Sequence, residues 1–188
     1  GFREPTPLQE QYLSTAFQGR DLVVESTEGE GKTIAQLLPI LSVAKPRKRG
    51  VSALILTDSV ESVEKYEREF HKFPASATRG KTLAALGKAD QPKKELKLLS
   101  KQPAIIVGTT ERIIDHIRRN NLSFPNGTTV VVNIPESKDR IEFNRDVEFI
   151  LTKMPGKGNV SFFAASAEHV KELEYLLKRP ITLSVEDR

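Results

Sequence analysis

The segment from Leu22 to Thr33 decides the interpretation of the chain, and it reads Leu-Val-Val-Glu-Ser-Thr-Glu-Gly-Glu-Gly-Lys-Thr. An apolar run typical of a strand leads into a turn with two glycines, and the helical pattern Lys32–Ala44 follows. Glycines let main-chain N–H groups wrap a phosphate chain, and the start of a helix adds its dipole. The segment therefore predicts a phosphate-binding loop, in which Lys32 reaches the outer phosphates and the Thr33 hydroxyl binds Mg²⁺.

Three residues of this loop depart from the usual pattern or complicate it. Ser26 stands where glycine is usual, and Glu28 and Glu30 place two carboxylates inside the loop. A carboxylate ~4 Å from a phosphate charge costs about 1 kcal/mol in water and more when desolvated. We expect nucleotide binding to be weakened if either glutamate points inward. An ordinary strand-to-helix turn that contains a lysine is the alternative interpretation.

Short apolar runs alternate with helical patterns along the rest of the chain. Most of the runs are continuous, which indicates strands buried on both faces, and the alternation predicts parallel strands joined by helices. The expected strands are Leu22–Glu25, Ala53–Leu56, Ala104–Val107, Thr129–Val132, Val160–Phe163 and Ile181–Val185, with a shorter one near Ser76–Thr78. The expected helices are Pro7–Phe17, Lys32–Ala44, Ser59–His71, Thr110–Asn120, Ile141–Lys153 and Ala167–Leu177. We predict an α/β fold, a three-layer sandwich with a mostly parallel central sheet.

Composition narrows the function classes. The chain has 188 residues, no cysteine and a net charge of +4, which excludes disulfides and thiol chemistry and permits a nucleic-acid partner. His71, His116 and His169 fit no metal-ligand spacing. No apolar stretch reaches the ~20 residues of a membrane span, so we expect no membrane partner and, by default, a cytoplasmic location.

The first 33 residues resemble the amino-terminal lobe of a DEAD-box RNA helicase. Gly1-Phe2 with Pro5-Thr6-Pro7-Leu8-Gln9 is similar to the adenine-reading Q motif of that family, and the loop at Ser26–Thr33 is similar to its motif I. The interval from Lys32 to Asn133, 133 − 32 = 101 residues, suits the distance between motifs I and II. The likeness covers essentially residues 1–188, which implies one RecA-like lobe, with the second lobe outside this chain.

The resemblance implies a pocket for ATP and Mg²⁺. Thr6–Gln9 also forms a capping box with Pro7 at the first helical position, so Gln9 has both a structural role and an implied adenine contact. The implied metal ligand is Thr33. The implied nucleotide-binding residues are Gln9, Ser26, Thr27, Glu28, Gly29, Glu30, Gly31, Lys32 and Thr33.

The acidic motif II of the family is degenerate here. Where the family has Asp-Glu-Ala-Asp, the chain has Asn133, Ile134, Pro135 and Glu136. Asn133 brings no charge to a metal-bound water, and Ile134 cannot accept a proton. Loss of a general base typically costs ~10²–10⁴ in rate. Glu136 lies beyond Pro135, and either a first-turn helix position or a role in the site accounts for it.

Motifs Ia and III are degenerate as well, whereas part of the motif that resembles Thr-Pro-Gly-Arg survives. Val60 replaces the arginine of motif Ia, next to a capping box expected from Asp58 and Glu61, and Ala164 lacks the first hydroxyl of motif III. Thr109 and Arg112 remain as candidate RNA contacts. Arg112 lies in a first helical turn, where either a nearby phosphate or a salt bridge to Asp115 would rationalise a cation.

Three functions stay open on the sequence alone. The leading hypothesis is a degenerate lobe that binds nucleotide or RNA and hydrolyses ATP poorly or not at all. The second is an active RNA-dependent ATPase in which Glu136 or the second lobe supplies the base. The third is a non-catalytic scaffold that binds a protein partner, and it draws support from Glu28, Glu30 and Val60.

Overall fold

A computed structural model describes residues 4–27, 29–44, 50–87, 92–137 and 140–184. One seven-stranded sheet, in the order β3-β4-β2-β5-β6-β1-β7, runs through the molecule, and every neighbouring pair is parallel. The strands are β1 (Leu22–Glu25), β2 (Ala53–Thr57), β3 (Leu83–Leu86), β4 (Ile105–Thr109), β5 (Thr129–Asn133), β6 (Val160–Ala164) and β7 (Ile181–Ser184). The predicted α/β fold with a parallel central sheet is confirmed.

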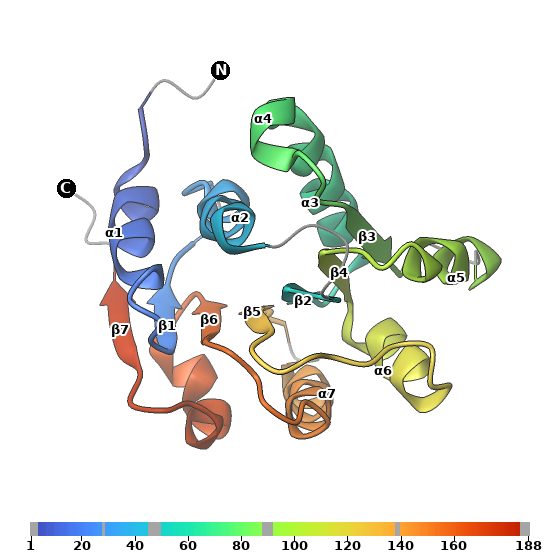
Figure 1. The fold of residues 1–188 in the computed structure, drawn as a ribbon. Helices are drawn as coiled ribbons and strands as arrows, with labels where there is room; N and C mark the ends of the chain where they lie inside the picture. Colours follow the sequence, from blue (N-terminus) through green and yellow to red (C-terminus); the bar gives the residue numbers. More distant parts are fainter. Residues whose placement is uncertain (1–3, 28, 45–49, 88–91, 138–139, 185–188) are drawn as a thin grey trace.

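Helices cover both faces of the sheet (Figure 1). One face carries α1 (Pro7–Ala16), α2 (Lys32–Val43), α3 (Val60–Lys72) and α4 (Ala75–Thr78), and the other carries α5 (Pro92–Ser100), α6 (Thr110–Arg118), α7 (Arg140–Thr152) and η1 (Ala167–Leu176). Alternate residues of each strand enter opposite cores, as Val131 and Val132 do in β5. None of the described helices is long and apolar enough to cross a membrane.

Local signals explain where the first helices begin. Thr6 caps α1 with the full capping box, in which Gln9 N–H donates to Thr6 Oγ1 and Thr6 N–H donates to Gln9 Oε1. The capping box predicted from Asp58 and Glu61 is wrong. Ser59 is the N-cap of α3, and its hydroxyl accepts from the Ser62 N–H, because the chain stays extended through Ser59.

Two other expectations require correction. The segment near Ser76–Thr78, expected as a short strand, is the one-turn helix α4, because Pro74 starts the turn and Ala75 and Ala77 favour a helix. The third strand is instead β3, Leu-Ala-Ala-Leu, whose two alanines lack the usual β-strand signal. The expected helix after β6 is a ten-residue 3₁₀ helix, η1.

Candidate functional site

The phosphate-binding loop lies where β1 ends and α2 begins. Gly31 is the N-cap of α2 with φ of 78°, and Gly29 has φ of 89°, so both glycines hold the left-handed conformation that this turn requires. Lys32 Nζ donates to the main-chain oxygen of Ser26 at 3.5 Å, which draws the lysine back across the loop. The strand, glycine turn and helix predicted from the sequence are therefore all present.

The first turn of α1 holds this loop from one side. Thr6 Oγ1 donates to Glu30 O at 3.0 Å, and Gln9 Nε2 donates to Gly31 O at 3.4 Å. A Cβ on Gly31 would lie 2.6 Å from Gln9 Nε2, so a larger residue at position 31 would displace the Gln9 side chain from this contact. Gln9 is buried and uses both polar atoms of its side chain, one on Thr6 and one on the loop.

Glu30 points into the loop. Its Oε2 accepts the Thr27 main-chain N–H at 2.8 Å. This is the inward orientation for which we expect weaker nucleotide binding, on the charge argument above. Glu28, the second acidic residue of the loop, lies outside the described residues.

Two further loop residues bear on whether a phosphate chain fits. The hydroxyl of Ser26 is buried and finds no hydrogen-bond partner among the described residues. Space above Gly29 is open, because a Cβ built there would meet nothing within 4 Å. A buried hydroxyl without a partner and the open space at Gly29 fit a phosphate chain. Buried Thr33 is the second residue of α2, directly after Lys32.

Asn133 ends β5 beside this helix and belongs to a polar network. Its Oδ1 accepts from Gln36 Nε2 at 2.8 Å, and its Nδ2 donates to the Tyr66 hydroxyl at 2.9 Å. Gln36 lies one helical turn after Lys32, so the network reaches the phosphate-binding loop through α2. The amide oxygen that would receive a metal-bound water is already engaged. Among the described residues, no three metal-ligating side chains gather at one place.

Tyr66 closes this network. Its hydroxyl donates to Gln36 Oε1, and burial raises the pKa of the phenol far above its usual value, with the Asn133 hydrogen bond acting weakly in the opposite direction. Tyr66 therefore stays neutral and remains a donor. The sequence analysis missed Gln36 and Tyr66, although a glutamine inside the apolar run from Ile34 to Leu38 was a signal of a buried polar contact.

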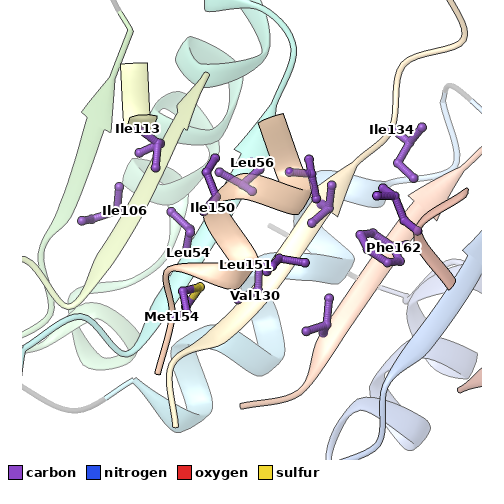
Figure 2. Packing of buried hydrophobic residues seen from close by; sticks show 14 of the residues in the cluster. Leu54, Leu56, Ile106, Ile113, Val130, Ile134, Ile150, Leu151, Met154 and Phe162 are labelled. Atoms are coloured by element: carbon purple, nitrogen blue, oxygen red, sulfur yellow. The ribbon is translucent and has the colours of Figure 1, made fainter. Parts of the chain in front are cut away.

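Ile134 belongs to the opposite core. Its side chain is 6% exposed and packs in the cluster that lies under α7 and η1, whereas Asn133 faces α2 and α3. Figure 2 shows Ile134 at the end of β5 among the buried side chains of that cluster. Glu136 is exposed on the segment after Pro135 and makes no hydrogen bond or ion pair with the described residues.

The segment that resembles motif III ends in the cap of a helix. Ala164 ends β6 and pairs with Glu25 at the end of β1, and Ser166 caps η1 by accepting the Glu168 N–H at 3.2 Å. The single hydroxyl of this segment thus serves the local backbone.

Thr109 and Arg112 line a cleft of about 870 Å³ at the carboxyl ends of β2, β4 and β5. Arg112 is already paired, because its Nε donates to Glu95 Oε2 at 2.5 Å and its Nη1 donates to Asp115 Oδ2 at 3.1 Å. The structure therefore confirms the salt bridge to Asp115 that the sequence offered as an alternative to RNA. Sequence reasoning missed Glu95.

Glu95 is a buried hub beneath this cleft. It is 3% exposed, and besides Arg112 it accepts the Gly87 N–H at 2.8 Å and lies 2.8 Å from His116 Nε2. Asp115 also pairs with Arg119, whose hydrogen bond lowers the pKa of Asp115. Ion pairs within the protein therefore engage two of the guanidinium groups of the cleft.

The lining of the cleft is acidic. Three guanidinium groups, those of Arg112, Arg118 and Arg119, face five carboxylates. The carboxylates belong to Asp58, Glu111, Asp115, Glu142 and Asp146. Asp146 accepts a hydrogen bond from Thr110, while Val60 lines the same cleft at the start of α3.

The parallel sheet and the glycine turn that feeds α2 define a P-loop protein with a RecA-like lobe. The model of the DEAD/DEAH box helicase family matches residues 6–173, so the chain belongs to this family. It is 33% identical over 166 residues to the DEAD-box ATP-dependent RNA helicase CshA of Bacillus cereus and 31% identical to the ATP-dependent RNA helicase CshA of Listeria monocytogenes.

Solved structures share the fold. A DEAD box protein from Methanococcus jannaschii superposes with a TM-score of 0.85 at 23% identity, covering 99% of this chain and 51% of that one. The yeast DEAD-box splicing factor Prp28 gives the same TM-score and is covered over 47% of its length. The present chain spans about a third of the length of the CshA relatives, 88% of it being matched to 31% of the B. cereus protein.

Proposed function

We propose that this lobe binds ATP with Mg²⁺ at the loop from Ser26 to Thr33, with reduced affinity, and hydrolyses it poorly or not at all. The observation that carries the proposal is the contrast between the two neighbouring strand ends. The loop after β1 has the backbone of a phosphate site, whereas β5 ends in the amide of Asn133, which is bound to Gln36 and Tyr66.

Each residue of the pocket has a defined part in this proposal. Lys32 binds the outer phosphates, main-chain N–H groups of the loop and the start of α2 bind the remaining oxygens, and Gln9 contacts the adenine edge after leaving Gly31. Thr33 is the protein ligand for Mg²⁺, which would neutralise phosphate charge. No carboxylate assists it at Asn133, so metal binding is weak.

Hydrolysis is impaired because neither Asn133, which ends β5, nor Ile134, which follows it, can deprotonate water. The side chain of Ile134 packs in the hydrophobic core and carries no proton acceptor. The absence of a general base alone lowers a rate by ~10²–10⁴, which raises the barrier by about 3–5 kcal/mol. Glu136, exposed and unpaired within the described part of the chain, is the residue on which the rival hypothesis of an active ATPase depends.

RNA binding in the cleft of Thr109 and Arg112 is weak in this proposal. Phosphate contacts require cations that are free to approach the backbone of a nucleic acid. Here Arg112 and Arg119 pair with Asp115, and carboxylates outnumber guanidinium groups. A second RecA-like lobe in the full-length protein would be the natural partner of this face, since the chain covers about half of the matched DEAD-box structures.

Calorimetric titration of the full-length protein with ATP·Mg²⁺ tests the binding half of the proposal. Heat of binding at millimolar nucleotide or below is expected, and Lys32→Ala should abolish it. RNA-stimulated ATPase activity of the same sample tests the second half. Robust turnover that falls in Glu136→Gln would establish the active enzyme instead, and the absence of any nucleotide binding would favour the scaffold.

A further inference from the structure

Glu30 is held at both its main chain and its side chain. The Glu30 carbonyl oxygen accepts from Thr6 Oγ1 at 3.0 Å, and Glu30 Oε2 accepts the Thr27 N–H at 2.8 Å. The main-chain contact fixes where the residue lies in the loop. The side chain then folds back over three residues onto the beginning of the loop.

The Thr27 N–H is a donor that a bound phosphate chain would need. Thr27 follows Ser26, whose buried hydroxyl has no hydrogen-bond partner among the described residues. Two residues after Thr27, a Cβ built on Gly29 would meet no atom within 4 Å, so the space there is open. Main-chain N–H groups of such a turn form an anion-binding concavity. A carboxylate oxygen at 2.8 Å is chemically the same kind of acceptor as a phosphate oxygen.

We propose that Glu30 is a built-in competitor of the phosphate chain, which occupies the Thr27 N–H in the free protein and must be displaced before a triphosphate binds. This inference rests on the proposed nucleotide site and adds that one residue sets its affinity. After displacement the carboxylate remains on the loop, so its repulsion of phosphate oxygens persists. Glu30 therefore lowers affinity both by occupying the donor and by its charge.

A purely structural tether makes the opposite prediction. If the Glu30–Thr27 contact only orders the loop, then its removal loosens the site and weakens phosphate binding. If Glu30 competes, then its removal strengthens binding even though one hydrogen bond of the free protein is lost. The sign of the change in affinity therefore separates the two roles.

The test compares Glu30→Ala and Glu30→Gln with the wild type in the full-length protein, using calorimetric titration with ATP·Mg²⁺ and with inorganic tripolyphosphate. Glu30→Ala should bind both ligands roughly tenfold more tightly, a change equivalent to about 1.4 kcal/mol. Glu30→Gln keeps an acceptor but removes the charge, so its gain should be smaller. Glu10→Gln, an exposed glutamate on α1, controls for net charge and should equal the wild type.

A readout without nucleotide accompanies the titration. Without ligand, the NMR signal of the Thr27 amide proton should lie further downfield in the wild type than in Glu30→Ala, because only the wild type offers this N–H a carboxylate acceptor. If the wild type binds and Glu30→Ala binds equally or more weakly, then Glu30 is not a competitor, whereas the proposed nucleotide site remains supported. If Glu30→Ala binds ATP·Mg²⁺ and the wild type does not, then Glu30 is a competitor and the proposed nucleotide binding of the wild type is wrong. If neither protein binds, then both proposals are wrong.

Discussion

The side-chain amides of Gln36 and Asn133 hydrogen-bond to each other in both directions. Gln36 Nε2 donates to Asn133 Oδ1 at 2.8 Å, and Asn133 Nδ2 donates to Gln36 Oε1 at 3.3 Å. A carboxylate at position 133 could serve only as an acceptor. The asparagine is therefore fitted to its present neighbours and cannot be exchanged for aspartate without consequences for the fold.

An acidic residue introduced at position 133 should destabilise the free protein. In Asn133→Asp the donations to Tyr66 and Gln36 are lost, and a charge enters a largely buried network. We expect a loss of about 1–3 kcal/mol in the free energy of unfolding. Urea denaturation measures it, with the exposed Asn121→Asp as the control. Unchanged or increased stability in Asn133→Asp would contradict the network as described.

Two glycines of the phosphate-binding loop should differ in their tolerance of alanine. Gly29→Ala and Gly31→Ala both place a side chain at positive φ, which costs roughly 1–2 kcal/mol. Only at Gly31 does the new Cβ meet Gln9 Nε2, at 2.6 Å, while the space at Gly29 is open. Thermal denaturation should show a clearly lower Tm for Gly31→Ala than for Gly29→Ala. Equal Tm values for the two variants would contradict the close contact between Gln9 Nε2 and Gly31.

Glu95 should be among the costliest polar residues to replace. Glu95→Gln removes the charge that Arg112 and His116 face, at a site that is 3% exposed. Breaking a buried pair from one side typically costs about 3–5 kcal/mol. Glu64→Gln removes only an exposed ion pair with Arg68, which is worth about 0–1 kcal/mol, and is the matched control. Similar urea midpoints for the two variants would contradict the stabilising role of the buried Glu95 contacts.

Stability should decline in alkaline solution because of Tyr12. Burial raises the pKa of Tyr12 to about 12 from the ordinary value of about 10 for tyrosine, while its hydrogen bond to Ser161 lowers the pKa. Between these two values the unfolded chain loses the proton and the folded chain keeps it, so stability falls as the pH rises, by up to about 1.4 kcal/mol per pH unit. Tyr12→Phe should show a shallower decline of its unfolding free energy above about pH 10. Parallel curves for the two proteins would contradict this.

The sequence predicted those parts of the fold that are encoded locally. The apolar runs located six of the seven strands because buried parallel strands are continuously apolar. The glycines and lysine of the loop and the capping box at Thr6 and Gln9 are likewise short-range signals. The sequence did not predict β3 because Ala84 and Ala85 have no preference for strands, and because its place in the sheet depends on pairing with β4.

The side-chain networks could not be predicted because their members lie far apart in the chain. Asn133 meets Gln36 across 97 positions and Tyr66 across 67, and Glu95 meets His116 across 21. Only the stacking of α2 and α3 on the sheet brings the first set together. The inward orientation of Glu30 was left open for a related reason, since the loop could present that side chain to either side. The direction became evident only from the Thr27 contact.

Equilibrium ATP binding and RNA-stimulated ATP hydrolysis can be followed in a single experiment on the same sample of the full-length protein. We expect ATP binding that depends on Lys32, together with a turnover no greater than that of a Lys32→Ala control. Turnover of the wild type well above that control would show that a group other than Asn133 or Ile134 supplies the base. That result would contradict the proposed loss of hydrolysis.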